Sequence, residues 1–129
     1  VYREKGEYDK AIIEFETSLQ LSEEHNLFLL KADALTGLGM IREKKAEYPT
    51  AIEYFNQSLQ TAQQIGDKFR EEKNLGNLGI VYQNLGEYEN AIQYLKASIE
   101  IAKQIGDKQN EGIFLGNVGD LSIGKMGRS

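Results

Sequence analysis

The sequence predicts an all-α protein, a solenoid of antiparallel helical hairpins with about three repeats and six helices. Two observations predict this fold class: a sequence repeat with a period of 40 residues, and apolar side chains spaced three or four residues apart. The composition agrees, because the 129 residues include one proline and no cysteine or tryptophan. A helical hairpin of this size cannot bury both of its apolar faces alone, so we expect neighbouring hairpins to stack.

The repeat is clearest in three short motifs. They are GEYDKAI from Gly6, AEYPTAI from Ala46 and GEYENAI from Gly86. Residues 47–86 and 87–126 are identical at 17 of 40 positions, which rules out a coincidence of helical composition. The register predicts one array over residues 1–129, with a partial repeat at 1–26, full repeats at 27–66 and 67–106, and a partial repeat at 107–129.

Residues that recur at this period identify the first three helices. Tyr8 opens the first helix and recurs as Tyr48 and Tyr88. Leu38 belongs to the second helix. That helix corresponds to the fourth helix, whose sequence signals are more complete. Pro49 lies in the first turn of the third helix, where its missing N–H costs little.

The last three helices have the most complete signals. Asp67 is an N-cap residue for the fourth helix, and Gly86 marks the turn that follows it. Tyr88 and Leu95 belong to the apolar stripe of the fifth helix. Gly106 ends that helix, and an aspartate follows as the next N-cap. We therefore expect helices at about 7–25, 28–45, 48–65, 68–85, 88–105 and 108–123.

These motifs resemble the tetratricopeptide repeat family. The third repeat carries the family pattern as Leu78, Gly79, Tyr82, Gly86, Tyr88, Ala91, Leu95 and Ser98. Arg42 and Ser122 replace the aromatic residue elsewhere, and Ala46 and Met126 replace the turn glycine. The period exceeds the usual value of about 34, and is similar to the long repeats of spindle-orientation scaffolds, kinesin light chains and bacterial multi-repeat proteins. The resemblance implies a right-handed superhelix whose concave face binds peptides or proteins.

Two glycines in the fourth helix need an explanation, because each costs a helix interior about 1 kcal/mol relative to alanine. Gly79 recurs as Gly39 and Gly119 and faces the small residue Ala91, which predicts a close helix crossing. Gly76 lies on the opposite side of the helix. It either opens the floor of a groove, in which case alanine there is neutral or slightly stabilising, or relieves crowding between repeats. A phosphate-binding loop is excluded, because no strand precedes the glycines and no GK[ST] follows.

In the family, the stripe opposite the core face of each first helix lines the binding groove. Asn77 and Asn117 are the strongest candidates, because each amide can pair with a peptide backbone, or else with a neighbouring helix. Arg3 and Glu4 hold the corresponding places in the first repeat. The expected partner-binding groove comprises Asp33, Thr36, Met40, Lys73, Asn77, Ile80, Gln83, Asn84, Asn117 and Asp120.

Composition also narrows the function. The net charge of −5 disfavours nucleic acid and anionic membranes as partners. No apolar run reaches the length of a membrane span. His25 is the only histidine and there is no cysteine, so we expect no zinc site and no cofactor. The helix dipole explains Glu71 and Glu72 as surface carboxylates in a first helical turn. Without a nucleophile–base pair we do not expect an enzyme, and the absence of cysteine fits a cytoplasmic protein.

The leading functional interpretation is a module that binds a protein or peptide partner in the groove. The alternative is a structural spacer or self-associating segment of a larger protein. It rests on the last helix, which has no following helix in the sequence to cover Phe114, Leu115, Val118 and Leu121. Such open faces favour a homo-oligomer formed through the ends of the solenoid.

Overall fold

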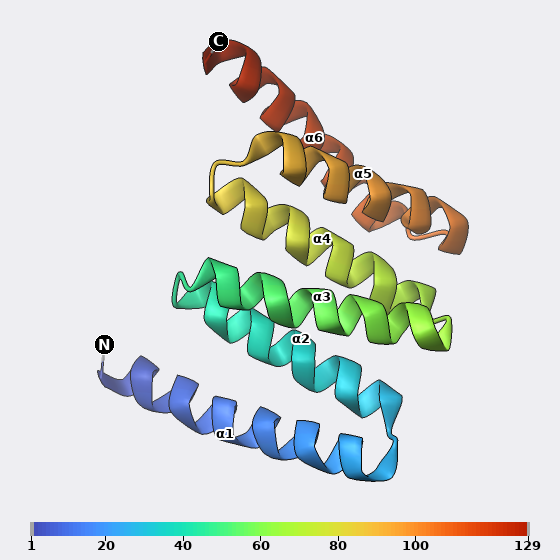
Figure 1. Cartoon of the computed structure of the whole chain (residues 1–129). Helices are drawn as coiled ribbons and strands as arrows, with labels where there is room; N and C mark the ends of the chain where they lie inside the picture. The colour runs from blue at the N-terminus through green and yellow to red at the C-terminus, as the bar shows by residue number, and fades with distance from the viewer. Residues whose placement is uncertain (1, 129) are drawn as a thin grey trace. The chain divides into compact units, whose positions relative to one another are not determined.

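The computed structural model describes residues 2–128, with side chains from residue 5 to residue 123. Residues 2–128 form six helices and no strand (Figure 1), which confirms the expected all-α class. Each of the last five helices begins at the expected residue. The helices are α1 (Tyr2–His25), α2 (Phe28–Lys44), α3 (Tyr48–Ile65), α4 (Lys68–Asn84), α5 (Tyr88–Ile105) and α6 (Lys108–Arg128).

The start of α1 differs from the expectation. Instead of beginning near residue 7, α1 begins at Tyr2 and runs through Gly6 without a break. A single glycine costs a helix only about 1 kcal/mol relative to alanine, so it does not end a helix by itself. Its counterpart Gly86 does lie in a turn, with a φ of 78°. The turn at Gly86 leads from one packed helix to the next, whereas Gly6 lies inside α1.

Each of the five connections contains one residue with a left-handed backbone. Such a residue reverses the chain at a helix end, and the next N–H then bonds a carbonyl of the last turn. At the end of α5, the Asp107 N–H donates to the Ala102 carbonyl at 2.8 Å. Glycine adopts this conformation without a steric penalty, whereas asparagine and alanine adopt it at a cost. The φ values are 54° at Asn26, 58° at Ala46, 70° at Gly66, 78° at Gly86 and 76° at Gly106.

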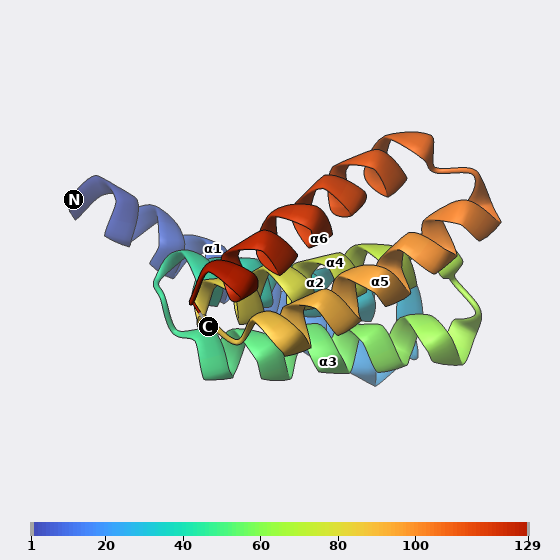
Figure 2. The ribbon, with the colours of Figure 1, turned by 90° about the horizontal axis from the view of Figure 1, so that it is seen from above.

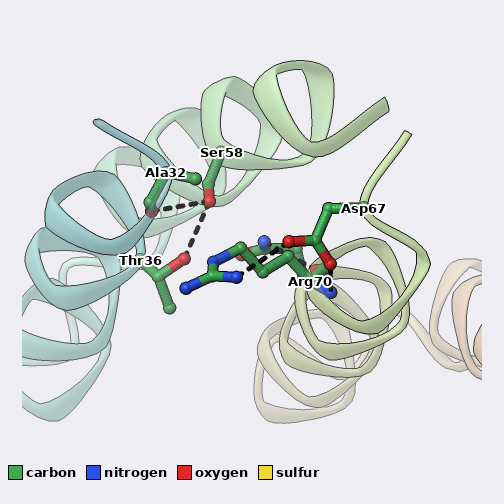
Figure 3. Close-up of polar contacts among 6 residues, drawn as sticks. Ala32, Thr36, Ser58, Asp67 and Arg70 are labelled. Atoms are coloured by element: carbon green, nitrogen blue, oxygen red, sulfur yellow. Dashed lines mark hydrogen bonds and ion pairs between the residues drawn. The ribbon is translucent and has the colours of Figure 1, made fainter. Parts of the chain in front are cut away.

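Aspartates cap α4 and α6, as the sequence predicts. The Asp67 Oδ1 accepts the Arg70 backbone N–H at 3.0 Å, and its Oδ2 accepts the Arg70 guanidinium at 2.8 Å (Figure 3). The backbone hydrogen bond is the main reason why the pKa of Asp67 lies below its ordinary value. The Asp107 Oδ1 accepts the Asn110 backbone N–H at 3.1 Å in the same way. Each cap satisfies an N–H that has no partner within its own helix.

The chain divides into two compact units, Val1–Ile65 (unit 1) and Gly66–Ser129 (unit 2). In unit 1, α2 packs against both α1 and α3; in unit 2, α5 packs against both α4 and α6. Figure 2 shows α6 running back along α5 after the turn between them. Large apolar side chains from both helices of a hairpin are fully buried, with Leu38 and Phe55 in unit 1 and Leu78 and Leu95 in unit 2 all 0% exposed.

The apolar residues of α6 do not form the single open face expected from the sequence. Leu121 is buried in a cluster with Ala91 and Leu95 of α5, and Phe114 and Val118 pack against the same cluster. These three residues of α6 follow steps of four and three, which places them on one side of the helix. Leu115 lies about 100° around the helix from Phe114, and its side chain is 51% exposed.

Candidate functional site

Unit 2 contains most of the expected groove residues. On α4, Lys73 and Asn84 are exposed, while Ile80 and Gln83 are half-buried. On α6, Asp120 is exposed and Asn117 is half-buried. The helical spacing therefore leaves polar side chains of both helices accessible.

Three expected residues border one hollow in unit 2. Gln83 and Asn84 lie at the end of α4, and Asp120 lies on α6. The hollow measures about 420 Å³ and is completed by Tyr88 and Leu121. Residues of three helices thus meet here, although they are far apart in the sequence.

The hollow combines two amides, a carboxylate, a phenol ring and an apolar side chain. The amides of Gln83 and Asn84 can each donate and accept, so they can pair with the N–H and C=O groups of a peptide backbone. Asp120 can only accept when it is ionised. Tyr88 and Leu121 offer apolar contact area. These side chains suit a peptide backbone that carries an apolar or partly polar side chain. They suit a strongly charged ligand less well.

Sequence reasoning did not identify Tyr88 and Leu121 as lining residues. It assigned Tyr88 to the apolar stripe of α5 and Leu121 to an open face. Both belong to the core side of their helices, but Tyr88 is only half-buried because it lies in the first turn of α5. For Tyr88 the sequence does contain a signal, because it is a core residue at a helix end close to the turn glycine Gly86.

Asn77 is neither exposed nor bonded to a neighbouring helix. Its side chain is half-buried, and its Nδ2 is enclosed without a hydrogen-bond partner. An enclosed amide without a hydrogen-bond partner lowers the stability of the folded protein. Asn77 therefore stays a candidate functional residue. Arg3 and Glu4, the corresponding residues of the first repeat, have side chains outside the described residues.

In unit 1, two expected residues are accessible and a third is not. Asp33 is exposed, and Met40 on the same helix is 41% exposed. Thr36 is buried, and its hydroxyl oxygen lies 2.8 Å from the Ser58 hydroxyl of α3 (Figure 3). Ser58 in turn donates to the Ala32 carbonyl at 2.8 Å, so the Thr36 hydroxyl donates to Ser58. Thr36 therefore joins α2 to α3, and we leave it out of the binding surface.

Gly76 does not lie on an open groove floor. A Cβ built on Gly76 would lie 2.7 Å from the Phe114 ring, closer than side chains approach one another. Gly76 is itself buried. The glycine thus leaves room for an aromatic ring of α6, which is the crowding alternative considered from the sequence. The open face from which a neutral alanine was expected is therefore not present.

We now expect Gly76→Ala to destabilise unit 2 relative to Gly116→Ala. Both changes gain about 1 kcal/mol of helix propensity. Only the alanine at residue 76 meets Phe114, whereas a Cβ at Gly116 meets nothing within 4 Å. Urea unfolding of both variants should give a lower free energy of unfolding for Gly76→Ala, by about 1–2 kcal/mol. Equal values would mean that the Phe114 ring moves aside freely.

Glu72 is not the solvated carboxylate expected from the sequence. Its side chain is 1% exposed, and its Oε1 accepts a hydrogen bond from the Asn110 Nδ2 at 2.8 Å. The same Asn110 nitrogen donates to Asp107 Oδ2 at 2.9 Å. The Glu72 backbone carbonyl accepts the Ser98 hydroxyl at 2.9 Å. Glu72 therefore connects α4 to α5 and to the start of α6.

Burial raises the pKa of Glu72 above its ordinary value of 4.5, and the nearby Asp107 raises it further. The Asn110 hydrogen bond opposes this shift but does not cancel it. A raised pKa means that the folded protein holds this proton more tightly than the unfolded chain does. The protonated group therefore stabilises the fold at low pH, and this contribution is lost as the pH rises through the folded pKa.

Glu72→Gln should remove this pH dependence, because glutamine keeps the acceptor for Asn110 and carries no charge. At neutral pH the variant should be more stable than the wild type by about 1 kcal/mol, because it removes the charge whose burial raises the pKa of Glu72. The advantage should vanish below pH 4.5, the ordinary pKa. Urea unfolding at several pH values measures the difference. The control Glu100→Gln, at a side chain that is 70% exposed, should show no such trend.

Two kinds of site are absent from the part of the chain that the structure describes. None of its helices has the length and hydrophobicity needed to cross a bilayer. It also contains no group of three or more histidine, aspartate or glutamate side chains placed to hold a metal ion.

The sequence matches the family model of the tetratricopeptide repeat over residues 1–64 and again over residues 30–104. A comparison with curated proteins finds no match to the sequence.

Two solved structures share the fold. The crystal structure of the apo form of RapI is similar with a TM-score of 0.73 and 23% identity, over 95% of this chain and 50% of RapI. BtubC (BKLC) from P. vanneervenii is similar with a TM-score of 0.67 and 19% identity, over 98% of this chain and 61% of BtubC. The chain thus spans half of RapI and less than two thirds of BtubC.

Proposed function

Because the chain belongs to the tetratricopeptide repeat family, we propose that it binds an extended segment of a partner protein on the face formed by α4 and α6 of unit 2. A helical repeat scaffold supports protein interaction in general. The observation that carries the finer proposal is the hollow where Gln83, Asn84 and Asp120 meet. In this proposal the chain acts by binding its partner and needs neither a cofactor nor a metal. Its cytoplasmic location is a prediction from the sequence.

The proposed mode of binding follows from the side chains at the hollow. The amides of Gln83 and Asn84 pair with the partner's backbone, and Asp120 accepts one of its N–H groups. One apolar side chain of the partner enters between Tyr88 and Leu121. An extended segment gains most from such contacts, because its backbone groups are not already paired with one another.

The remaining candidates extend this surface within each unit. On unit 2, Lys73, Ile80 and Asn117 continue along the same faces of α4 and α6, and the half-buried Asn77 lies between Lys73 and Ile80 on α4. On unit 1, Asp33 and Met40 are accessible on α2 and offer a separate contact. Basic side chains other than Lys73 are absent from this set, so nucleic acid and anionic membranes are not the proposed partners.

The test uses peptides selected from a random-peptide library against the 129-residue chain. A selected peptide should bind the variant carrying Gln83→Ala and Asp120→Ala about tenfold more weakly or worse, as expected for two lost hydrogen bonds. Fluorescence polarisation with the labelled peptide measures the affinity. Gln104→Ala with Glu100→Ala removes the same functional groups from exposed positions of α5 and should bind as the wild type does. Unchanged binding by the first double variant, or failure to select any peptide, would contradict the proposal.

A further inference from the structure

The buried carboxylate of Glu72 has one oxygen that lacks a hydrogen-bond donor. Its side chain is 1% exposed, and its Oε1 accepts the Asn110 Nδ2 at 2.8 Å, whereas its Oε2 is enclosed without a partner among the described residues. Asn110 Nδ2 cannot supply the missing donor, because it has two hydrogens and donates the second to Asp107 Oδ2 at 2.9 Å. A buried acceptor without a donor lowers the stability of the fold.

The shared amide also brings the carboxylates of Glu72 and Asp107 together. Both bond to one planar NH₂ group, so the two bonded oxygens lie within about 5 Å of each other. Asp107 is half-buried, and its Oδ1 accepts the Asn110 backbone N–H at 3.1 Å, which fixes its position at the start of α6. Two carboxylates this close repel each other when both are ionised, and the repulsion is strongest where water is excluded.

The groups around Glu72 leave Asp107 as the charge that it meets. α5 faces Glu72 with the Ser98 hydroxyl, which donates to the Glu72 backbone carbonyl and not to its carboxylate. Burial first, and then Asp107, hold the pKa of Glu72 above its ordinary value. Two cations close to Glu72 in the sequence are paired with other carboxylates, in the pairs Lys68–Glu71 at 3.4 Å and Arg70–Asp67 at 2.8 Å.

We propose that Glu72 and Asp107 share one proton, and that this proton holds the start of α6 to α4. The proton is taken up from solvent and resides on Glu72 Oε2, which becomes an O–H donor to the Asp107 carboxylate. The Asn110 bond to Glu72 Oε1 is kept, so both oxygens of Glu72 then have a partner. As the pH rises through the folded pKa of Glu72, the proton is lost, the two charges repel and the attachment of α6 weakens.

This attachment concerns a helix that also borders the hollow of unit 2. Asp120 and Leu121 of the hollow lie on α6, so the shared proton also acts on one side of the proposed binding surface. That consequence rests on the proposed function, whereas the shared proton itself does not. Both measurements below therefore use the 129-residue chain without a partner.

An NMR titration of the side-chain carboxyl carbons tests the shared proton. The Glu72 and Asp107 signals should change together through the same pH steps, because the protons of an interacting pair belong to both groups. Asp107→Asn should move the Glu72 midpoint to lower pH, since it removes the charge and keeps an N-cap acceptor. Asp67→Asn is the matched control: Asp67 caps α4 in the same way, and the Glu72 midpoint should not move.

Hydrogen exchange tests the attachment of α6. After correction for the intrinsic effect of pH, the backbone amides of residues 111–116 should be protected about threefold or more better at pH 4.5, the ordinary pKa, than at pH 7. Glu72→Gln should abolish this difference, because glutamine supplies an N–H donor that does not titrate, and Glu100→Gln should keep it. Glu72 and Asp107 signals that titrate separately, an unmoved Glu72 midpoint in Asp107→Asn, or wild-type protection that is equal at both pH values would each overturn the proposal.

Discussion

Replacing Gly79 with leucine should lower the free energy of unfolding by about 2–3 kcal/mol, as overpacking a close helix crossing does. A Cβ at this position would already lie 2.7 Å from both the Cγ and the Cδ2 of Leu95. It would also lie 3.3 Å from the Ala91 backbone carbonyl, which cannot move without moving α5. A leucine side chain adds three further carbons to the same space, so α4 and α5 have to separate. Urea unfolding of the variant and the wild type measures the loss.

Gly119→Leu is the matched control for this prediction. Gly119 holds the same position in the next repeat, and a Cβ there meets nothing within 4 Å. Leucine is a better helix former than glycine, so this variant should be as stable as the wild type or up to about 1 kcal/mol more stable. If both variants lost the same amount of stability, the crowding at Gly79 would not be the cause.

Several helix boundaries were predictable because they have a local signal of their own. Asp67 and Asp107 cap the helices that follow them, and the left-handed glycines mark the ends of α3, α4 and α5. These signals act over a few residues, so they do not depend on the rest of the fold. The predicted start of α1 was too late, because Gly6 was interpreted as a turn residue by comparison with Gly86 in the third repeat. Glycine alone does not force a turn.

Contacts between helices were less predictable, because they depend on which residue of one helix lies opposite the other. Gly76 faces Phe114, whose counterpart in the preceding repeat is Asn74, so the repeat pattern gave no indication of an aromatic ring there. Glu72 accepts a hydrogen bond from Asn110 of α6, and this contact depends on how α6 packs.

The candidate site shows the same division between helical spacing and packing. Helical spacing predicted that Gln83, Asn84 and Asp120 belong to one surface, and in the structure these three residues border one hollow of unit 2. It did not separate Thr36 from them, because a threonine can face solvent or bond a buried hydroxyl such as that of Ser58. Helical spacing specifies on which side of a helix a residue lies, whereas the burial of that residue depends on the neighbouring helix.

Replacing Phe55 with alanine should cost about 3–5 kcal/mol, the largest loss that we expect from a single substitution in this chain. Phe55 is the largest fully buried side chain among the described residues. Its ring fills the space above Gly39, where a Cβ would lie 2.7 Å from it. Alanine would leave this space empty, because the backbones of α2 and α3 are joined nearby through Thr36 and Ser58 and cannot close over it. Urea unfolding measures the loss.

Two further variants separate cavity formation from the loss of an aromatic ring. Phe55→Leu should cost less than about 1.5 kcal/mol, because Leu95 fills the corresponding position of the next repeat beside Gly79 and is 0% exposed. Phe69→Ala removes a ring that is 59% exposed and should change stability by no more than about 0.5 kcal/mol. If Phe55→Leu were as costly as Phe55→Ala, the ring itself would be required and the two repeats would not be interchangeable here. If Phe55→Ala cost no more than Phe69→Ala, α2 and α3 would close over the space, and the hairpin would be more deformable than its hydrogen-bonded contacts indicate.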